Sequence, residues 1–283
     1  MSESSTSEAP AQPFVGRRAV SPTETVTAQR RWWDAEAADY RVEHGAFLGP
    51  GGAGFVWGPD GLQEEDAGLL GDVAGRRVLE FGAGAAQCAR WLAGRGAQVV
   101  ATDLSMGMLR EGVVLDRQAR STTPLLQCDA RALPFMDNAF DAVFTSYGAL
   151  PFVADADRVL RECARVLRPG GRFAASVAHP IRWTLPDVPG AAGLTACHSY
   201  FDRTPYVEAD EHGIVSYVEH HRTVGDWVRL LRDAGLQLVD LVEPEWLAGD
   251  AQWGGWSRLR GDLLPGTLIL VAELPRGQVH DPA

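Results

Sequence analysis

The amino-acid sequence predicts an α/β fold built on a parallel, doubly wound sheet. Between residues 76 and 179, short apolar runs alternate with segments of helical periodicity, and the connections between them are short. A glycine-rich turn directly follows the first of these apolar runs, at a strand-to-helix transition. The chain has 283 residues, of which 46% are apolar, and this is enough for a sizeable core.

The part of the chain ahead of the alternation has a different composition. Residues 1–25 are rich in Ser, Thr, Glu, Ala and Pro, which predicts a disordered tail. Residues 27–42 fit a helix because Trp33, Ala37 and Tyr40 recur at helical spacing. The segments that follow are a loop or lid dense in Gly and Pro (45–61) and a short helix (62–70).

The alternating part contains five strands and three helices. The strands are expected at residues 76–81, 97–103, 124–129, 140–147 and 172–179, and the helices at 86–94, 105–117 and 155–167. Pro169-Gly170-Gly171 stops the last of these helices. After Pro180 the alternation lapses until a helix begins at Thr223, where Asp226 completes a capping box. The remaining strands are expected at residues 236–243 and 267–274.

These patterns divide the chain into six parts, and no internal repeat is present. The parts are a tail (1–25), an N-terminal helical cap with a glycine-rich lid (26–70), a ligand-binding core (71–180), an insertion that caps the substrate (181–222), a C-terminal helix with the strands that complete the sheet (223–274), and a second tail (275–283).

The basic residues of the chain are all Arg. Lys and Arg together number 26 against 37 Asp and Glu, which gives a formal net charge of −11, and Lys is absent. Without Lys there is no Schiff-base nucleophile and no G-x-x-x-x-G-K-[ST] phosphate loop. The acidic balance also disfavours nucleic acid as a partner, because nucleic-acid binding needs a positive surface.

The sequence favours a cytoplasmic protein. The spacing of its cysteines suits neither a zinc site nor a disulfide framework, and free thiols are typical of a reducing compartment. No apolar run approaches the ~18 residues of a membrane span, so no membrane partner is expected. The N-terminus also lacks the basic and apolar regions of a signal peptide.

The residues with the clearest chemical meaning end three neighbouring strands. The run Val78-Leu79-Glu80-Phe81-Gly82-Ala83-Gly84-Ala85-Ala86 ends a strand in an acid and opens a helix through a glycine turn, which lets a ligand approach the backbone closely. Asp103 ends the second strand, where a carboxylate accepts both ribose hydroxyls of a nucleoside. Cys128-Asp129-Ala130 ends the third strand, where an acid accepts from an exocyclic amine.

Two cofactor classes fit a glycine turn followed by an acid about 20 residues later. Dinucleotide-binding folds require a small third residue in G-x-G-x-x-G/A, and that position is Gln87 here. Glu80 would also repel a pyrophosphate, whereas the ammonium group of an amino-acid nucleoside can lie near it. Both residues disfavour a dinucleotide. A non-catalytic nucleotide-binding protein of the dinucleotide type is kept as the less favoured alternative.

Together these motifs resemble the class I S-adenosylmethionine-dependent methyltransferases. VLEFGAGAA is similar to the family's first motif, E/D-x-G-x-G-x-G, with Ala86 in place of the last Gly, a change expected to cost little inside the helix start. ATDLSMGML resembles the second motif, CDARALPFMDNAFD resembles the D-A-x-x-L-P-F-x-D-x-x-F-D run of small-molecule members, and RVLRPGGRFAASV is similar to the run before the fifth strand. The resemblance covers residues 76–180. It implies a Rossmann-like, seven-stranded sheet with helices on both faces and an antiparallel last strand.

The resemblance implies S-adenosylmethionine as the cofactor and assigns residues to its parts. Asp103 is expected at the ribose, Leu104 and Met108 beside the adenine, and Asp129 near the adenine amine. Tyr40 matches an aromatic position in a helix that closes over the methionine end. The full set expected to bind the cofactor is Tyr40, Glu80, Gly82, Ala83, Gly84, Gln87, Asp103, Leu104, Met108, Cys128, Asp129, Ala130 and Ser146.

Aromatic and titratable residues concentrate outside the alternating core. Eight of the nine Trp lie there, and five of the seven His lie between residues 179 and 221. This distribution favours an aromatic pocket for a small molecule in the segments that cap the cofactor. The alternative is that Trp fills gaps in irregular regions and that His lies in loops.

Three residues are expected to act in catalysis. His179 ends the fifth strand at the same sheet edge as the cofactor acids, and His220 belongs to an adjacent pair of which at most one side chain faces a pocket. Tyr147 faces the methyl-transfer zone by analogy with the family. His198 is a further candidate. No spacing of His and carboxylates supports a metal site, so none is expected.

The expected reaction is in-line displacement of the sulfonium methyl group by a nucleophile of a small-molecule acceptor, with alignment carrying much of the catalysis. A base is needed only where that nucleophile carries a proton. An enzyme of the same fold that acts on RNA or protein is the second possibility, but neither a basic face nor an added binding domain is found. Nothing in the sequence indicates an oligomeric state.

Overall fold

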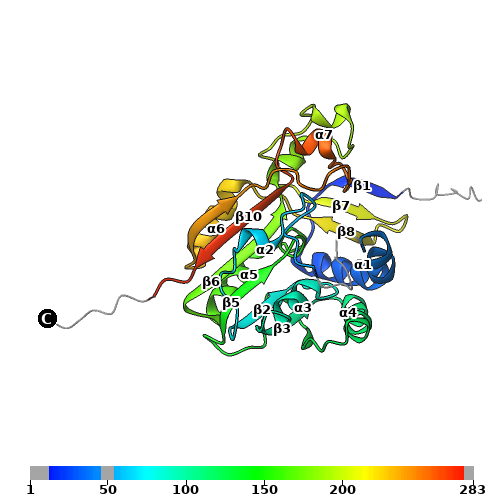
Figure 1. The fold of residues 1–283 in the computed structure, drawn as a ribbon. Helices are drawn as coiled ribbons and strands as arrows, with labels where there is room; N and C mark the ends of the chain where they lie inside the picture. The colour runs from blue at the N-terminus through cyan, green and yellow to red at the C-terminus, as the bar shows by residue number, and fades with distance from the viewer. Residues whose placement is uncertain (1–12, 46–53, 277–283) are drawn as a thin grey trace, which may run out of the picture.

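The computed structural model describes residues 13–45 and 54–276, and its centre is a seven-stranded sheet (Figure 1). The strands of this sheet are β2 (Arg77–Phe81), β3 (Gln98–Asp103), β4 (Leu125–Gln127), β5 (Phe140–Thr145), β6 (Leu167–Ala178), β9 (Gln237–Val242) and β10 (Thr267–Glu273). Their order across the sheet is β4-β3-β2-β5-β6-β10-β9. The first five strands pair in parallel, and β10 runs antiparallel to both of its neighbours. The doubly wound sheet with an antiparallel last strand is therefore confirmed.

Helices cover both faces of this sheet. The α-helices of the described residues are α1 (Pro22–Glu43), α2 (Glu64–Ala67), α3 (Gln87–Ala93), α4 (Met106–Ala119), α5 (Ala156–Val166), α6 (Val224–Asp233) and α7 (Arg258–Gly261). One apolar cluster joins α5 and α6 to one face of the sheet, and a second cluster joins α3 to the other. No helix in the described part of the chain is long and apolar enough to span a lipid bilayer.

A second, smaller sheet was not expected from the sequence. It contains β1 (Phe14–Arg17), β7 (Tyr206–Ala209) and β8 (Val215–Glu219), which pair antiparallel in the order β1-β7-β8. In Figure 1 it lies above α1, away from the central sheet. Val207 and Val218 of this sheet are fully buried in a cluster with Ala28 of α1.

The boundaries at the N-terminus differ from the expectation accordingly. The stretch predicted as a tail (1–25) contains β1 and the first turn of α1, which begins with a capping box between Ser21 and Glu24. Residues 46–53 of the expected glycine-rich lid (45–61) lie outside the described residues. The described end of that stretch belongs to the core, because Phe55 and Trp57 are fully buried against the central sheet. The capping box between Thr223 and Asp226 is confirmed.

One carboxylate joins α1 to the start of α4. Asp34 Oδ1 accepts hydrogen bonds from the Ser105 hydroxyl at 2.6 Å and from the Gly107 amide at 2.8 Å. Ser105 is itself the N-cap of α4, where its hydroxyl accepts from the Met108 amide. Acids are favoured at helix N-termini because the first amides lack helical partners. The contact fixes α1 beside the end of β3.

Replacing Gly107 with Ala is expected to lower the free energy of unfolding by about 1–3 kcal/mol, because a Cβ there would lie 2.8 Å from the Asp34 carbonyl oxygen. Urea denaturation at equilibrium measures the change. Gly190→Ala is the matched control, since a Cβ at Gly190 meets nothing within 4 Å. Equal stability of both variants would show that α1 does not pack closely against α4.

Candidate active site

A cavity of about 1010 Å³ lies at the carboxyl ends of the parallel strands. Its floor consists of the turn after β2 and the residues that follow β3, β4, β5 and β6. Its other walls come from α1, the small sheet, and two segments at residues 182–187 and 253–256. Ligands of open α/β sheets bind at this edge, where helices start and backbone amides are free.

The glycine turn after β2 adopts a conformation that needs its glycines. Gly82 and Gly84 have φ values of +60° and +54°, and a Cβ at Gly82 would collide with the side chain of Ala149. Ala86, expected inside the helix start, is instead the N-cap of α3 with φ +58°. That left-handed conformation costs a residue with a Cβ roughly 1–2 kcal/mol. The family motif has Gly at the position of Ala86, and Gly would adopt this left-handed conformation without that cost.

Asp103, at the end of β3, is held by two backbone amides. Its Oδ2 accepts from the Gly84 amide and its Oδ1 from the Ser105 amide, both at 2.8 Å. Burial raises the pKa of Asp103, and these two hydrogen bonds partly offset that rise. The carboxylate is thus fixed at the cavity wall, with lone pairs left to accept from a ligand hydroxyl.

Asp129, after β4, is paired with a residue that the sequence did not indicate. The Arg131 guanidinium binds both oxygens of Asp129, at 2.7 Å for its closest contact, and also reaches Asp155. Burial alone would raise the pKa of Asp129, but the hydrogen bonds from Arg131 outweigh it and hold the pKa below its usual value. Asp129 therefore stays ionised at the cavity wall.

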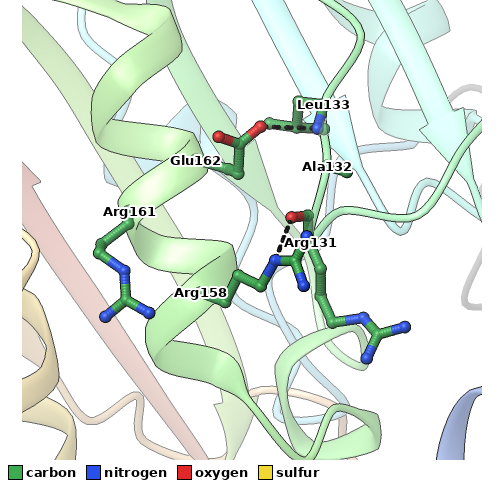
Figure 2. Close-up of a pocket in the computed structure, with 6 residues that line it drawn as sticks. All are labelled: Arg131, Ala132, Leu133, Arg158, Arg161 and Glu162. Atoms are coloured by element: carbon green, nitrogen blue, oxygen red, sulfur yellow. Dashed lines mark hydrogen bonds between the residues drawn. The ribbon is translucent and has the colours of Figure 1, made fainter. Parts of the chain in front are cut away.

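The loop that carries this pair is supported from behind by α5. A second hollow of about 280 Å³ lies between the loop and the helix, and Figure 2 shows the residues that line it. Arg158 Nε donates to the Arg131 carbonyl at 2.9 Å, and the Leu133 amide donates to Glu162 Oε2 at 2.8 Å. In the same view the Arg131 guanidinium points away from α5. Helix α5 thereby holds the backbone while the side chain holds Asp129.

Twelve of the thirteen expected cofactor residues line the cavity, and the exception is Glu80. Gln87 carries a further sign of a ligand, because its buried Oε1 has no hydrogen-bond partner among the described residues. An acceptor left unpaired in a protein interior is costly unless a ligand donates to it. Ser146 is fixed by donating its hydroxyl to the Val56 carbonyl at 2.7 Å.

Glu80 lies behind the glycine turn rather than in the cavity wall. It is 1% exposed, and its Oε2 accepts from the Ala89 amide in α3 at 2.9 Å. Burial raises the pKa of Glu80 to about 8, which the hydrogen bond from Ala89 only partly opposes. The Glu80 side chain turns toward the start of α3 and does not line the cavity.

Aromatic rings from distant segments meet above the turn. Tyr40 contacts Trp33 with ring centroids 5.5 Å apart and Trp253 at 6.3 Å. Tyr147 meets the other side of Trp253 at 6.0 Å in an edge-to-face arrangement. All four rings line the cavity. The expected aromatic pocket is therefore present.

Trp253 belongs to a tight hairpin that the sequence analysis did not single out. Its amide and carbonyl both bond to Trp256, and Gly254 between them has φ +53°. The Gly255 amide donates to Asp187 Oδ1 at 2.7 Å, which ties the hairpin to the capping insertion. The sequence Trp253-Gly254-Gly255-Trp256 could have predicted this hairpin, because two adjacent glycines between large apolar residues favour a tight turn.

His179 and His220, the two histidines expected to act in catalysis, do not reach the cavity. Ala178 lines it, and His179, the next residue, points away and bonds through its ring nitrogens to Glu243 at 2.9 Å and the Ile181 amide. Glu219 also lines it, while His220 bonds to the Thr25 hydroxyl. Successive side chains of an extended chain point to opposite sides, and this places both rings behind the wall.

Of the other candidates, Tyr147 and His198 line the cavity, and His221 does not. Tyr147 has φ +45°, and its amide donates to the Ser176 hydroxyl at 2.7 Å. Burial raises the pKa of the Tyr147 hydroxyl above its ordinary value. Within residues 13–45 and 54–276, no group of three or more His, Cys, Asp or Glu side chains is arranged to hold a metal ion.

Comparison with known proteins gives a consistent picture for the core. A family model described as "Methyltransferase domain" matches residues 79–175. A demethylmenaquinone methyltransferase of Renibacterium salmoninarum is 41% identical over 112 residues, and that of Mycolicibacterium vanbaalenii is 48% identical over 97 residues. These matches cover 39% and 34% of this chain, and only 45% and 40% of those proteins. The chain thus spans less than half the length of these relatives.

Solved structures match over more of the chain. An S-adenosylmethionine-dependent methyltransferase from Mesorhizobium loti is 30% identical with a TM-score of 0.60, and the match covers 76% of this chain and 100% of that one. A 1,6-didemethyltoxoflavin-N1-methyltransferase from Burkholderia thailandensis, solved with its substrate and S-adenosylhomocysteine, has a TM-score of 0.59. At 19% identity, with 94% of this chain and 100% of that one covered, it is similar in fold.

The high pKa of Glu80 makes stability depend on pH. Because this pKa is about 8 in the folded protein against an ordinary 4.5, the folded state retains a proton that the unfolded state has released. The free energy of unfolding is expected to fall as pH rises from about 5 to about 8, by an amount of order 1–4 kcal/mol. In Glu80→Gln this contribution should vanish. Urea denaturation of both proteins at several pH values tests it, and parallel stability curves would contradict the assignment.

Proposed function

This chain belongs to the family of S-adenosylmethionine-dependent methyltransferases, and we propose that it transfers a methyl group to a small organic molecule. The observation that carries the proposal is the shared cavity. A glycine turn with two fixed acids lines one part of it. A separate aromatic part is formed by Tyr147 together with segments outside the region that matches the family model. A volume of about 1010 Å³ is at the upper end for small-molecule sites.

Residues of the core would hold the cofactor. Asp103, whose orientation two amides fix, would accept from the ribose hydroxyls, and Asp129 would accept from the adenine amine. The unpaired Gln87 Oε1 would accept from the ammonium group, in place of Glu80. Leu104 and Met108 would lie against the adenine. The donor and acceptor chemistry of these residues fits the cofactor.

The bound cofactor would supply an electrophilic methyl group on a sulfonium. Tyr40, Trp253 and Tyr147 would surround that region with aromatic rings, which exclude water and favour a nearby cation. Tyr147 remains protonated at neutral pH because burial raises its pKa, so its hydroxyl would donate a hydrogen bond rather than remove a proton. We do not assign a base to His179 or His220, since neither lines the cavity.

A small acceptor fits the surroundings better than a macromolecule does. Rings and carboxylates from three separate segments enclose the acceptor part, and the chain carries a net charge of −11, which opposes nucleic acid. We also propose a cytoplasmic location, because Cys88, Cys128, Cys163 and Cys197 are all free thiols.

The proposal is tested by incubating the protein with methyl-labelled S-adenosylmethionine and small-molecule extracts, followed by mass identification of labelled products. A labelled product below about 1 kDa, absent without protein, is expected for a cavity of this size. Label found only in RNA or protein would overturn the choice of acceptor.

Asp103→Ala should weaken binding of S-adenosylhomocysteine at least about tenfold, since a charge-assisted pair of hydrogen bonds is worth roughly 1.5–3 kcal/mol. Isothermal titration calorimetry measures the affinity. Asp240→Ala, at an exposed position of β9, is the control and should bind as the parent does. An Asp103→Ala protein with parental affinity would refute the proposed cofactor position.

A further inference from the structure

The small sheet turns one face toward the cavity. Its register pairs Arg17 with Tyr206 and Tyr206 with Glu219, and in the next row Glu208 pairs with Tyr217. All five side chains line the cavity. Phenol rings and charged groups therefore alternate across the three strands. None of them lies in the region that matches the family model, residues 79–175.

Two of these carboxylates are held in place by neighbours. The Arg182 guanidinium, which also lines the cavity, contacts both oxygens of Glu219 at 3.2 Å. A second acid, Asp187, lies 3.9 Å from the same guanidinium. Glu208 receives only the hydroxyl of Tyr206, at 2.7 Å. Arg182 is thus already engaged by protein carboxylates, while Glu208 has no basic partner among the described residues.

The charge of the cavity wall is strongly negative. Seven carboxylates and two guanidinium groups line it. Asp103 and Asp129 are assigned to the cofactor, and Arg17 is balanced by Asp202 at 3.7 Å. Of the other five carboxylates, Glu36 and Glu43 belong to α1. Asp187, Glu208 and Glu219 face the acceptor part, against Arg182 and the already paired Arg17. An anionic acceptor would be repelled there, whereas a cation would be attracted, and both effects are stronger away from bulk water.

Aromatic rings stand beside these acids. Tyr217 contacts Trp32 at 5.2 Å and Phe152 at 5.7 Å between ring centroids, and Trp183 lies 6.2 Å from Tyr206. Tyr147 and Tyr217 are part-buried and line the cavity, and neither hydroxyl bonds to another described residue. Phenol oxygens left in this way can accept hydrogen bonds from a ligand. Aromatic faces next to carboxylates are typical of sites for organic cations.

We propose that the acceptor of this enzyme is an organic amine that is protonated at neutral pH. Its charge lies between Glu208 and Glu219, and its carbon frame lies against Trp32, Tyr217 and Trp183. This inference rests on the proposed function, because it concerns the acceptor part of the same cavity. It makes no statement about which atom of the acceptor receives the methyl group.

Three probes of one shape and different charge test the proposal. Tryptamine is cationic, tryptophol is neutral and indole-3-propionate is anionic, and all three carry the same ring. Calorimetric titrations are made on the full chain saturated with S-adenosylhomocysteine. Tryptamine is expected to bind at least about tenfold more tightly than tryptophol, and indole-3-propionate most weakly. Equal affinities, a preference for the anion, or no binding of tryptamine at about 10 mM would overturn the proposal.

The variant Glu208→Gln separates charge from shape. Glu208→Gln is expected to weaken the binding of tryptamine about tenfold and to leave the affinities for tryptophol and S-adenosylhomocysteine unchanged. The control variant Asp240→Asn on β9 should change none of these affinities. Unaltered tryptamine affinity in Glu208→Gln would also overturn the proposal. Failure of the proposed function is distinguishable, because the parent protein would then not bind S-adenosylhomocysteine at all.

Discussion

The carboxylate of Asp103 is the junction on which the arrangement of the cavity depends. One of its oxygens holds the glycine turn through Gly84, and the other holds the start of α4 through Ser105. The Ser105 hydroxyl in turn donates to Asp34, which fixes α1 over the cavity. A single chain of hydrogen bonds thus runs from the cofactor side to the helix that forms the opposite wall. The three hydrogen bonds are 2.6–2.8 Å long and part-buried, so a change at one end alters the position of the other.

The two parts of the cavity have different origins in the chain. Apart from Tyr40 of α1, the residues proposed to hold the cofactor lie in one continuous stretch, which falls within the region that matches the family model. The acceptor part is assembled from residues near 15–45, 180–220 and 250–256, which meet only in the folded molecule. Binding energy for the acceptor therefore depends on contacts between remote segments, such as the bond from Gly255 to Asp187. Its chemistry can differ from that of a relative even where the core is nearly half identical.

The core could be predicted because its signals are local. The strand ending at Asp103 and the helix after Ser105 need only their own apolar period and cap, and both were found within two residues. The small sheet could not be predicted, because about two thirds of the 283-residue chain separates β1 from β7 and their polar and aromatic residues resemble a loop. His179 shows a second limit. Its position at a strand end was predicted correctly, but the side to which it points depends on strand parity, which a shift of one residue reverses.

The place of β10 in the sheet has a consequence for how the protein is made. This strand follows β9 in the chain, yet it lies between β6 and β9 and is almost completely buried. During synthesis one edge of β6 is open, and β9 has no neighbour in the central sheet, until β10 has left the ribosome. The half-finished sheet exposes a long apolar edge in that interval, which is a template for pairing with other chains. A chain without β10 would therefore leave one edge of β6 unpaired and β9 detached from the central sheet, which favours aggregation.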